Sequence, residues 1–189
     1  MRPHTDTRAR IQEIALKLFT EQGYEATSLR EIAETLGVTK AALYYHFKTK
    51  DDIVASLAED RQAAVERLLK WAQDQPRTIE TRREFVRRYA DEVYGGHHHA
   101  FTRFMERNQT ALRGHPKFDK MRKLMTTLGG VLWDEDASVA QRLRSSMAIF
   151  TLHASWFVLK DEQITNEERK TAALDLALDL LESAQPSGR

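Results

Sequence analysis

The stretch Thr27–Lys50, which reads TSLREIAETLGVTKAALYYHFKTK, decides the fold of this chain. Its first part places apolar residues at the i, i+3, i+4, i+7 spacing of one helix face: Leu29, Ile32, Ala33 and Leu36. A second short helix is expected from Lys40 to about Phe47, with Leu43 and Phe47 on its core face. Only Gly37, Val38 and Thr39 separate the two helices, so the chain must turn sharply between them.

The signals that begin and end these helices agree with that interpretation. Ser28 and Glu31 have the Ser-x-x-Glu spacing of a capping box, Gly37 is a natural helix end, and Thr39 can cap the next helix. Two short helices joined by a tight turn predict a helix-turn-helix, whose second helix enters the major groove by its N-terminal half.

The rest of the chain also has the helical period. A preceding helix is indicated by apolar residues that end before Gly23: Ile11, Ile14, Ala15, Leu18 and Phe19. Asp51 and Asp52 suit the start of a fourth helix that runs to about Gln73. Five further helices are expected at 78–94, 98–112, 117–132, 137–160 and 166–184. The sequence therefore predicts an all-α fold, with a DNA-binding domain at 1–50 and a larger ligand-binding and dimerisation domain at 51–189.

The second helix of the motif offers side chains suited to DNA. Lys40 can bond the O6 and N7 atoms of guanine, and the small Ala41 and Ala42 allow close approach or contact with a thymine methyl. The remaining candidates are phosphate-side groups: Thr27 and Ser28 at a helix N-terminus, Tyr44, Tyr45, His46, Lys48 and Lys50.

Charge patterning supports this interpretation, because no acidic residue lies between Glu34 and Asp51 although the net charge of the whole chain is only +1. A Tyr-Tyr-His-Phe cluster on an amphipathic helix is also typical of core packing, and that alternative stays open at this point.

Several fixed positions of the segment resemble the DNA-binding signature of the TetR family of transcriptional regulators. They are Thr27, Ile32-Ala33, Gly37-Val38, Leu43-Tyr44-Tyr45-His46-Phe47 and Lys50-Asp51, together with Ala15–Phe19 and Gly23-Tyr24. The resemblance covers roughly residues 8 to 57. Ala41 and Ala42 depart from it, since Gly and Thr are frequent there, so the operator sequence does not carry over.

The resemblance implies a function for each matched position. Base-reading positions are Thr39, Lys40, Ala41 and Ala42, and phosphate-side positions are Thr27, Arg30, Tyr44, Tyr45, His46 and Lys50. It also implies a homodimer that represses from a palindromic operator and is released by a small effector. As a separate hypothesis, Arg2, Arg8 and Arg10 could form an arm near the minor groove.

The last two expected helices are apolar on more than one face, which requires two partners. In 137–160 one such face is Leu143, Met147, Phe150, Ala154 and Phe157. We interpret 137–160 and 166–184 as the dimer helices, since a two-fold operator requires a two-fold protein. The alternative is a helix enclosed in the core of its own chain.

Candidate effector-binding residues are the aromatic, Met and His side chains of the middle helices. They are Phe85, Tyr89, Phe101, Phe104, Met105, Met121, Met125, Trp133, Phe150, His153 and Trp156. This composition favours an apolar or aromatic ligand. The same residues at helical spacing are also typical of an ordinary core.

Other function classes find little support. The chain has no Cys, no Gly-rich phosphate loop and no Gly-x-Ser-x-Gly or His-Glu-x-x-His motif, so we do not expect an enzyme or a cofactor. His97-His98-His99 on a helix would point apart, and we expect no metal. The absence of Cys, of a secretory signal and of a long apolar run fits a cytoplasmic protein. A helical protein-interaction module, with the helix-turn-helix as scaffold, is the remaining rival.

Overall fold

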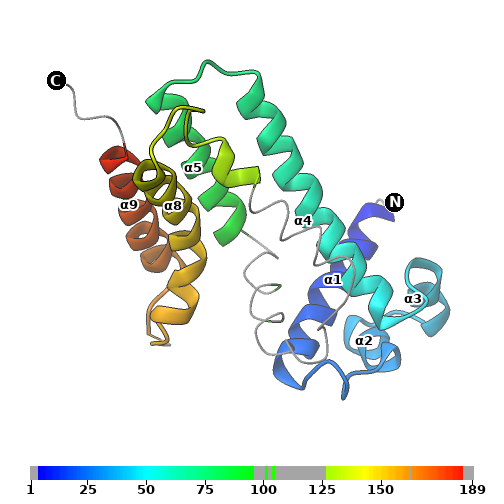
Figure 1. The fold of residues 1–189 in the computed structure, drawn as a ribbon. Coiled ribbons are helices and arrows are strands. Elements are labelled where there is room, and N and C mark those ends of the chain that lie inside the picture. The colour runs from blue at the N-terminus through cyan, green and yellow to red at the C-terminus, as the bar shows by residue number, and fades with distance from the viewer. Residues whose placement is uncertain (1–3, 96–100, 102–103, 105–126, 162, 185–189) are drawn as a thin grey trace. The chain divides into compact units, whose positions relative to one another are not determined.

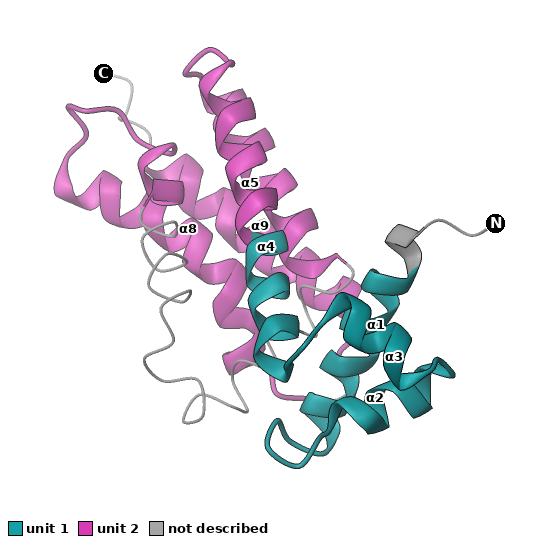
Figure 2. Cartoon of the chain, turned by 90° about the vertical axis from the view of Figure 1, so that its right-hand side faces the viewer, with its two compact units in different colours: residues 1–61, 96–119 teal, residues 62–95, 120–189 magenta. Residues whose placement is uncertain are grey.

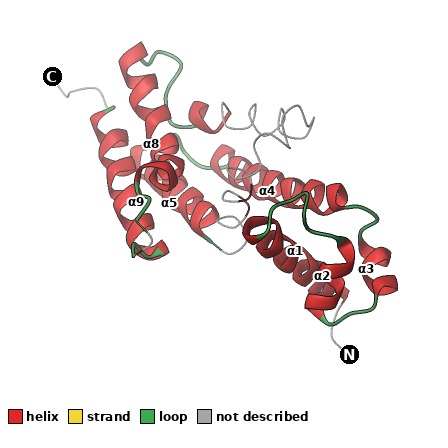
Figure 3. Ribbon diagram, turned by 90° about the horizontal axis from the view of Figure 1, so that it is seen from below, coloured by secondary structure: helices red, strands yellow, loops and turns green. Residues whose placement is uncertain are grey.

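The regular elements of the computed structural model are helices throughout the described chain, namely residues 4–95, 101, 104, 127–161 and 163–184 (Figures 1 and 3). The prediction of an all-α fold is confirmed for these residues. The labelled helices are α1 (His4–Glu21), α2 (Leu29–Leu36), α3 (Lys40–His46), α4 (Lys50–Gln73), α5 (Ile79–Tyr94), α8 (Val139–Val158) and α9 (Asn166–Ser183).

From α2 onward, the predicted helices agree with the labelled ones to within about two residues. The expected helices at 98–112 and 117–132 lie mostly outside the described residues; within them, residues 127–130 are helical. α1 begins at His4, earlier than its apolar pattern. The hypothesis of an N-terminal arm is therefore wrong for Arg8 and Arg10, which lie within α1, and Arg2 lies outside the described residues.

Local hydrogen bonds define the turn between α2 and α3. Ser28 and Glu31 form the predicted capping box at the start of α2. Gly37 ends α2 with a left-handed φ of 74°, its N–H donates to Glu34 O at 3.1 Å, and the Val38 N–H donates to Ala33 O at 3.0 Å. This Schellman arrangement satisfies the last carbonyls of α2 and reverses the chain within two residues. Thr39 then caps α3 by accepting from the Ala42 N–H at 3.1 Å.

The chain forms two compact units, residues 1–61 with 96–119 and residues 62–95 with 120–189 (Figure 2). The division falls inside α4, so this helix contributes its first half to unit 1 and its second half to unit 2. The functional boundary expected after residue 50 stays a prediction, which the compactness of the two units does not test.

Unit 1 has a core drawn from α1 to α4. Ile11, Phe19, Ile32, Leu43 and Ile53 are each 0% exposed. Burial of a large aliphatic or aromatic side chain contributes roughly 1.5–3 kcal/mol, so this small core is sufficient to hold two helices that would not persist alone.

Unit 2 is built on the adjacent helices α5, α8 and α9, which share a second core (Figure 1). Phe85, Tyr89 and Leu152 are 0% exposed there. The buried Arg169 of α9 closes the C-terminal end of α8 by donating to Ser155 O at 2.9 Å and to Leu159 O. A guanidinium at the carbonyl end of a helix satisfies orphan acceptors and opposes the helix dipole.

No helix in the described part of the chain is both long enough and apolar enough to cross a lipid bilayer.

The left-handed Gly37 predicts a defined cost of substitution. A Cβ at this position would meet no atom within 4 Å, so Gly37→Ala changes only the backbone energy. We expect it to lower the free energy of unfolding by about 1–2 kcal/mol, measured by urea denaturation. Gly130→Ala is the control, since Gly130 also has open space but no positive φ, and its effect should stay within about 0.5 kcal/mol. Equal effects of the two substitutions would contradict this account of the turn.

Candidate nucleic-acid interface

α3 presents its N-terminal half to solvent. Thr39, Lys40 and Ala41 are exposed, whereas Leu43 is 0% and Phe47 3% exposed in the core of unit 1. The first turn of α3 contains no acidic residue. A short helix that is fixed by one face and offers a basic N-terminal half on the other has the form of a major-groove reader.

Aromatic groups lie beside the basic ones on α3. Lys40 Nζ lies 5.4 Å from the ring centre of Tyr44, which packs partly against the core. Tyr45 is 74% exposed, and its ring meets that of His46 edge-on at 5.2 Å. The predicted core face and the predicted polar face of this helix are thus separated as the spacing indicated.

The N-terminus of α2 differs in part from the prediction. Thr27 is 1% exposed and its hydroxyl donates to Gly23 O at 2.9 Å, so its side chain braces the loop before α2. Ser28 is exposed, but its Oγ accepts from the Glu31 N–H at 3.2 Å within the capping box. Arg30 is exposed and forms an ion pair with Glu34 at 2.7 Å. An exposed pair of this kind contributes little to stability, so Arg30 can exchange Glu34 for another anion.

Lys48 and Lys50 differ in their surroundings. Lys48 is exposed and its Nζ donates to Tyr44 O. Lys50 is only partly exposed; its Nζ donates to the carbonyl oxygens of Tyr24 at 2.6 Å and Glu25 at 3.3 Å, and it lies 4.5 Å from the Tyr24 ring centre. Lys50 therefore ties the start of α4 to the loop before α2, a role that its position in the sequence did not reveal.

Tyr24 completes this contact between the loop and α4. Its hydroxyl donates to Asp51 Oδ1, and burial, followed by this hydrogen bond, raises the pKa of Tyr24 well above its ordinary value. The phenol consequently stays protonated and remains a donor at any physiological pH. Asp51 was predicted only as a favourable charge at a helix start.

The N-terminus of α4 has a cap that the sequence analysis missed. Asp52 Oδ2 accepts from the N–H groups of Lys48 at 3.0 Å and Thr49 at 2.9 Å, and the Asp52 N–H donates to Thr49 Oγ1 at 3.0 Å. The signal was present as Thr49-x-x-Asp52, a variant of the capping-box spacing. This reciprocal cap fixes the chain immediately after α3.

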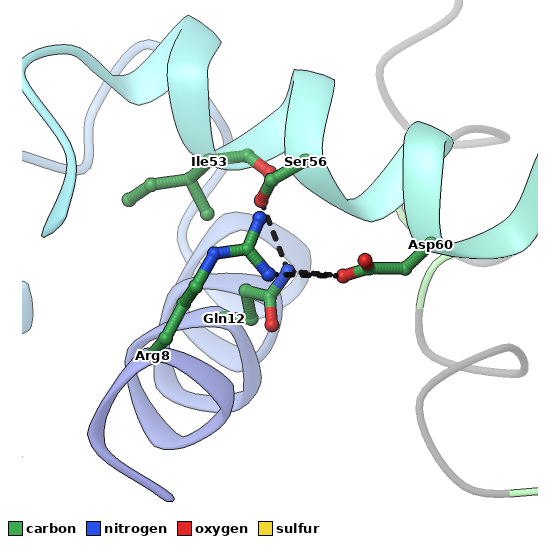
Figure 4. Close-up of polar contacts among 5 residues, drawn as sticks. All are labelled: Arg8, Gln12, Ile53, Ser56 and Asp60. Carbon is green, nitrogen blue, oxygen red and sulfur yellow. Dashed lines mark hydrogen bonds and ion pairs between the residues drawn. The ribbon is translucent and has the colours of Figure 1, made fainter. Parts of the chain in front are cut away.

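A polar cluster between α1 and α4 was also missed (Figure 4). Gln12 Nε2 donates to Ser56 Oγ at 2.9 Å and to Asp60 Oδ2 at 2.7 Å, and Arg8 Nη1 lies 3.4 Å from the same Asp60 oxygen. Ser56 Oγ in turn donates to Ile53 O at 2.7 Å. Single polar residues on two helices give no pairing signal in the sequence. The cluster holds α1 to α4 and takes Arg8 away from any role as a mobile arm.

The structure separates the predicted effector-binding residues. Phe85 and Tyr89 lie in the core of unit 2, and Tyr89 Oη is 2.8 Å from Nε2 of the half-buried His153. Phe101 and Phe104 are buried in the core of unit 1, with Phe104 against the ring of Phe19 at 5.5 Å.

The other candidates lie elsewhere. Trp156 stacks on Tyr94 at 5.4 Å, and Trp133 lines a cavity of about 310 Å³. Phe150 is 56% exposed on α8. Met105, Met121 and Met125 lie outside the described residues. The described candidates are distributed over both units, and an effector pocket formed by them stays a prediction.

Within the described ranges, no group of three or more His, Asp or Glu side chains could hold a metal ion. His97, His98 and His99 lie outside those ranges.

A capped two-helix turn, an exposed basic helix face and a small core that fixes both define a helix-turn-helix DNA-binding domain. Residues 11–57 match the profile of the family described as "Bacterial regulatory proteins, tetR family". The HTH-type transcriptional regulator AcrR of Shigella flexneri is 48% identical over 54 residues, which are 29% of this chain and 25% of AcrR. The N-terminal region is therefore similar to the DNA-binding domain of TetR-family transcriptional regulators.

Solved structures resemble the chain over a greater length. The fold is similar to that of Mycobacterium smegmatis AmtR, with a TM-score of 0.71, 24% identity and coverage of 95% of this chain and 88% of AmtR. It is also similar to the ketosteroid transcriptional regulator KstR2 of Mycobacterium tuberculosis, with a TM-score of 0.64, 19% identity and coverage of 92% and 93%. These identities show a shared fold. Sequence identity with AcrR spans only a quarter of that protein, so the function of the whole chain is a proposal.

The contact between Tyr24 and Asp51 gives a testable stability effect. Tyr24→Phe removes a hydrogen bond to a charged acceptor, and we expect the free energy of unfolding to fall by about 1–2 kcal/mol in urea denaturation. Tyr45→Phe is the matched control, because Tyr45 is 74% exposed, and its effect should lie within about 0.5 kcal/mol. If Tyr24→Phe were as mild as Tyr45→Phe, the hydroxyl would not hold the start of α4.

Proposed function

We propose that this protein binds a palindromic operator as a homodimer, represses transcription there, and is released when a small molecule binds its larger helical region. The observation that carries the DNA-binding part is the exposed, acid-free N-terminal half of α3, held by the burial of Leu43 and Phe47. A helix fixed in this way keeps its base-contacting side chains in one geometry without ordering them on binding.

Base reading is assigned to Thr39, Lys40, Ala41 and Ala42. Lys40 is exposed at the first position of α3, from which a side chain reaches the floor of the major groove. Ala41 is exposed and Ala42 half-buried, and neither side chain extends beyond Cβ, so the backbone can approach the base edges closely.

Phosphate contacts are assigned to the surrounding polar groups. Tyr45, Lys48 and Arg30 are exposed and carry donors, whereas Tyr44 and His46 are half-buried on the same helix. Ser28 and the first N–H groups of α2 offer donors at a helix N-terminus. Thr27 contributes indirectly, because its hydroxyl holds the loop before α2 by donating to Gly23 O. Lys50 adds a positive charge close to the proposed phosphate contacts, while its Nζ donates to the carbonyl oxygens of Tyr24 and Glu25.

Dimerisation is assigned to α8 and α9. Leu143, Met147, Phe150 and Phe157 are 61%, 42%, 56% and 52% exposed, and their spacing places them on the face of α8 opposite its buried residues. On α9, Leu176 is 52% exposed although Ala173 and Ala177 are buried. Monomeric proteins rarely expose a continuous apolar stripe of this kind, and a second copy would cover it.

Effector control is assigned to unit 2 and α4. An effector bound there can change operator affinity only if it binds two states of the dimer with different affinities. In one state the two α3 helices lie at the operator spacing of about 34–36 Å, and in the other state they do not. α4 belongs to both units and is one of the places where the chain passes between them. The buried Tyr89 and the half-buried His153 supply a hydrogen-bonding pair beside a largely apolar core, which suits an apolar or aromatic effector with a polar group.

The DNA-binding proposal predicts different effects of two lysine substitutions. Selection from a random DNA pool should yield a palindrome, bound with a log–log salt slope of about −0.9 for each phosphate neutralised. Lys40→Ala should change the selected bases, with a loss of roughly 1–3 kcal/mol for the original operator. Lys48→Ala should weaken all sequences alike and reduce the salt slope by about one. Recovery of no specific DNA by a folded protein would favour the protein-interaction rival.

The dimer proposal predicts that one apolar residue controls the oligomeric state. Phe150→Asp places a carboxylate in the centre of the exposed stripe, where burial against a partner would be costly. Light scattering after gel filtration should then give a monomer, with unchanged circular dichroism and weakened operator binding. Phe150→Leu keeps the site apolar and should remain a dimer. A dimer that survives Phe150→Asp would place the interface elsewhere.

A further inference from the structure

A cavity of about 410 Å³ lies in unit 2 at the turn between α4 and α5. Its polar lining includes Arg77, Thr81 and Arg82 together with Gln73, Gln75 and Thr127, and Pro76 and Val131 add apolar surface. Two arginines line it, and none of the described lining residues is acidic. A cavity of this size accommodates a small organic molecule, and the sign of its charged groups indicates an anion.

Arg82 is the central group of this cavity. The residue is 7% exposed, and its Nη2 donates to Asp134 Oδ1 at 2.6 Å. Its Nε is buried and has no hydrogen-bond partner in the structure. Burial of a guanidinium with one satisfied donor and another left unpaired is costly. An additional anion beside Arg82 would lower that cost.

A neighbouring cavity of about 310 Å³ helps to decide where such an anion binds. Arg82 lines it too, but there it is accompanied by Asp134 and Asp136. Two carboxylates oppose the entry of a further negative charge. Only on the α4–α5 side does Arg82 combine with a second cation, Arg77, and no acidic group.

The helix start at this place adds to the attraction. Thr81 and Arg82 belong to the first turn of α5, whose N-cap is Thr78. The N-terminal end of a helix carries a partial positive charge, so it favours an anion in the adjoining cavity. Glu80 lies in the same turn but does not line the cavity.

We propose that this cavity binds a small monocarboxylate with an apolar body, its carboxylate beside Arg82 and Arg77 and its apolar part against Pro76 and Val131. Guanidinium groups bind carboxylates through paired, charge-assisted hydrogen bonds. The apolar lining favours an organic acid over a bare inorganic ion. The site is distinct from the Tyr89–His153 region, and this proposal does not rest on the proposed DNA binding.

The test is isothermal titration calorimetry of the full-length protein at low salt with two probes, benzoate and hexanoate. Benzamide serves as a neutral control of the same shape as benzoate. We expect at least one of the two carboxylates to bind. If benzoate binds, benzamide should bind at least about tenfold more weakly than benzoate. Absence of binding by both carboxylates, or equal binding of benzamide and benzoate, overturns the proposal.

Charge variants locate the site. Arg82→Gln should weaken the bound carboxylate roughly tenfold or more, and Arg77→Gln, in the exposed turn, about three- to tenfold. Arg87→Gln is the matched control, because Arg87 is an exposed arginine of α5 that lines neither cavity, and its affinity should be unchanged. The assignment is contradicted if Arg77→Gln keeps wild-type affinity, or if Arg87→Gln loses as much affinity as Arg77→Gln. Neither outcome depends on whether the Arg82→Gln protein folds.

A steric variant tests the same site without changing its charge. Gly130 lines the cavity, and a Cβ built on it would meet no atom within 4 Å. Gly130→Leu should fill the space and lower carboxylate affinity at least about tenfold, whereas Gly130→Ala should retain most of it. Full affinity in a folded Gly130→Leu protein shows that the carboxylate binds elsewhere.

Discussion

The helix-turn-helix depends on one constraint, which is that helices as short as α2 and α3, with 8 and 7 residues, do not persist alone in water. They exist because Ile32, Leu43 and Phe47 are buried in a core that α1 and α4 complete. The left-handed Gly37 makes this possible, since it lets both helices reach the same core with only two residues between α2 and the cap of α3. Every property of the exposed face of α3 follows from the burial of its other face.

Polar contacts then determine how firmly this unit is held at its edges. Gln12, Ser56 and Asp60 join α1 to α4, and Tyr24, Lys50 and Asp51 join the loop before α2 to the start of α4. Lys50, which the sequence suggests for phosphate binding, is thereby bonded within the protein. A buried or half-buried cation needs acceptors, and in this unit the nearest ones are backbone carbonyls and carboxylates. On α3, by contrast, Lys40, Ala41 and Tyr45 are exposed.

Unit 2 shows how one helix can serve two surfaces. α8 buries Ala148, Ile149 and Leu152 against α5 and α9, yet exposes an apolar stripe on its opposite side. Arg169 and Tyr94 hold the end of α8 through backbone carbonyls, so the stripe is presented by a helix with a satisfied C-terminus. In the first turn of α5, Arg82 forms an ion pair with Asp134, which lies in the loop before α8. The exposed stripe lies on α8, whereas the proposed carboxylate cavity is lined mainly by the end of α4, the following turn and the start of α5.

The sequence by itself determined the all-α class, the bounds of the labelled helices from α2 onward to within about two residues, the caps at Ser28, Gly37 and Thr39, and the division of α3 into a core face and a more exposed face. These are local properties, set by period, capping and turn chemistry within a few residues. Only the tertiary structure decided that Thr27 and Lys50 bond inward, that Arg8 pairs with Asp60, and that Phe101 and Phe104 share a core with Phe19. The physical reason is that a side chain's partner across a core depends on how distant segments pack, and neither spacing nor composition records that distance.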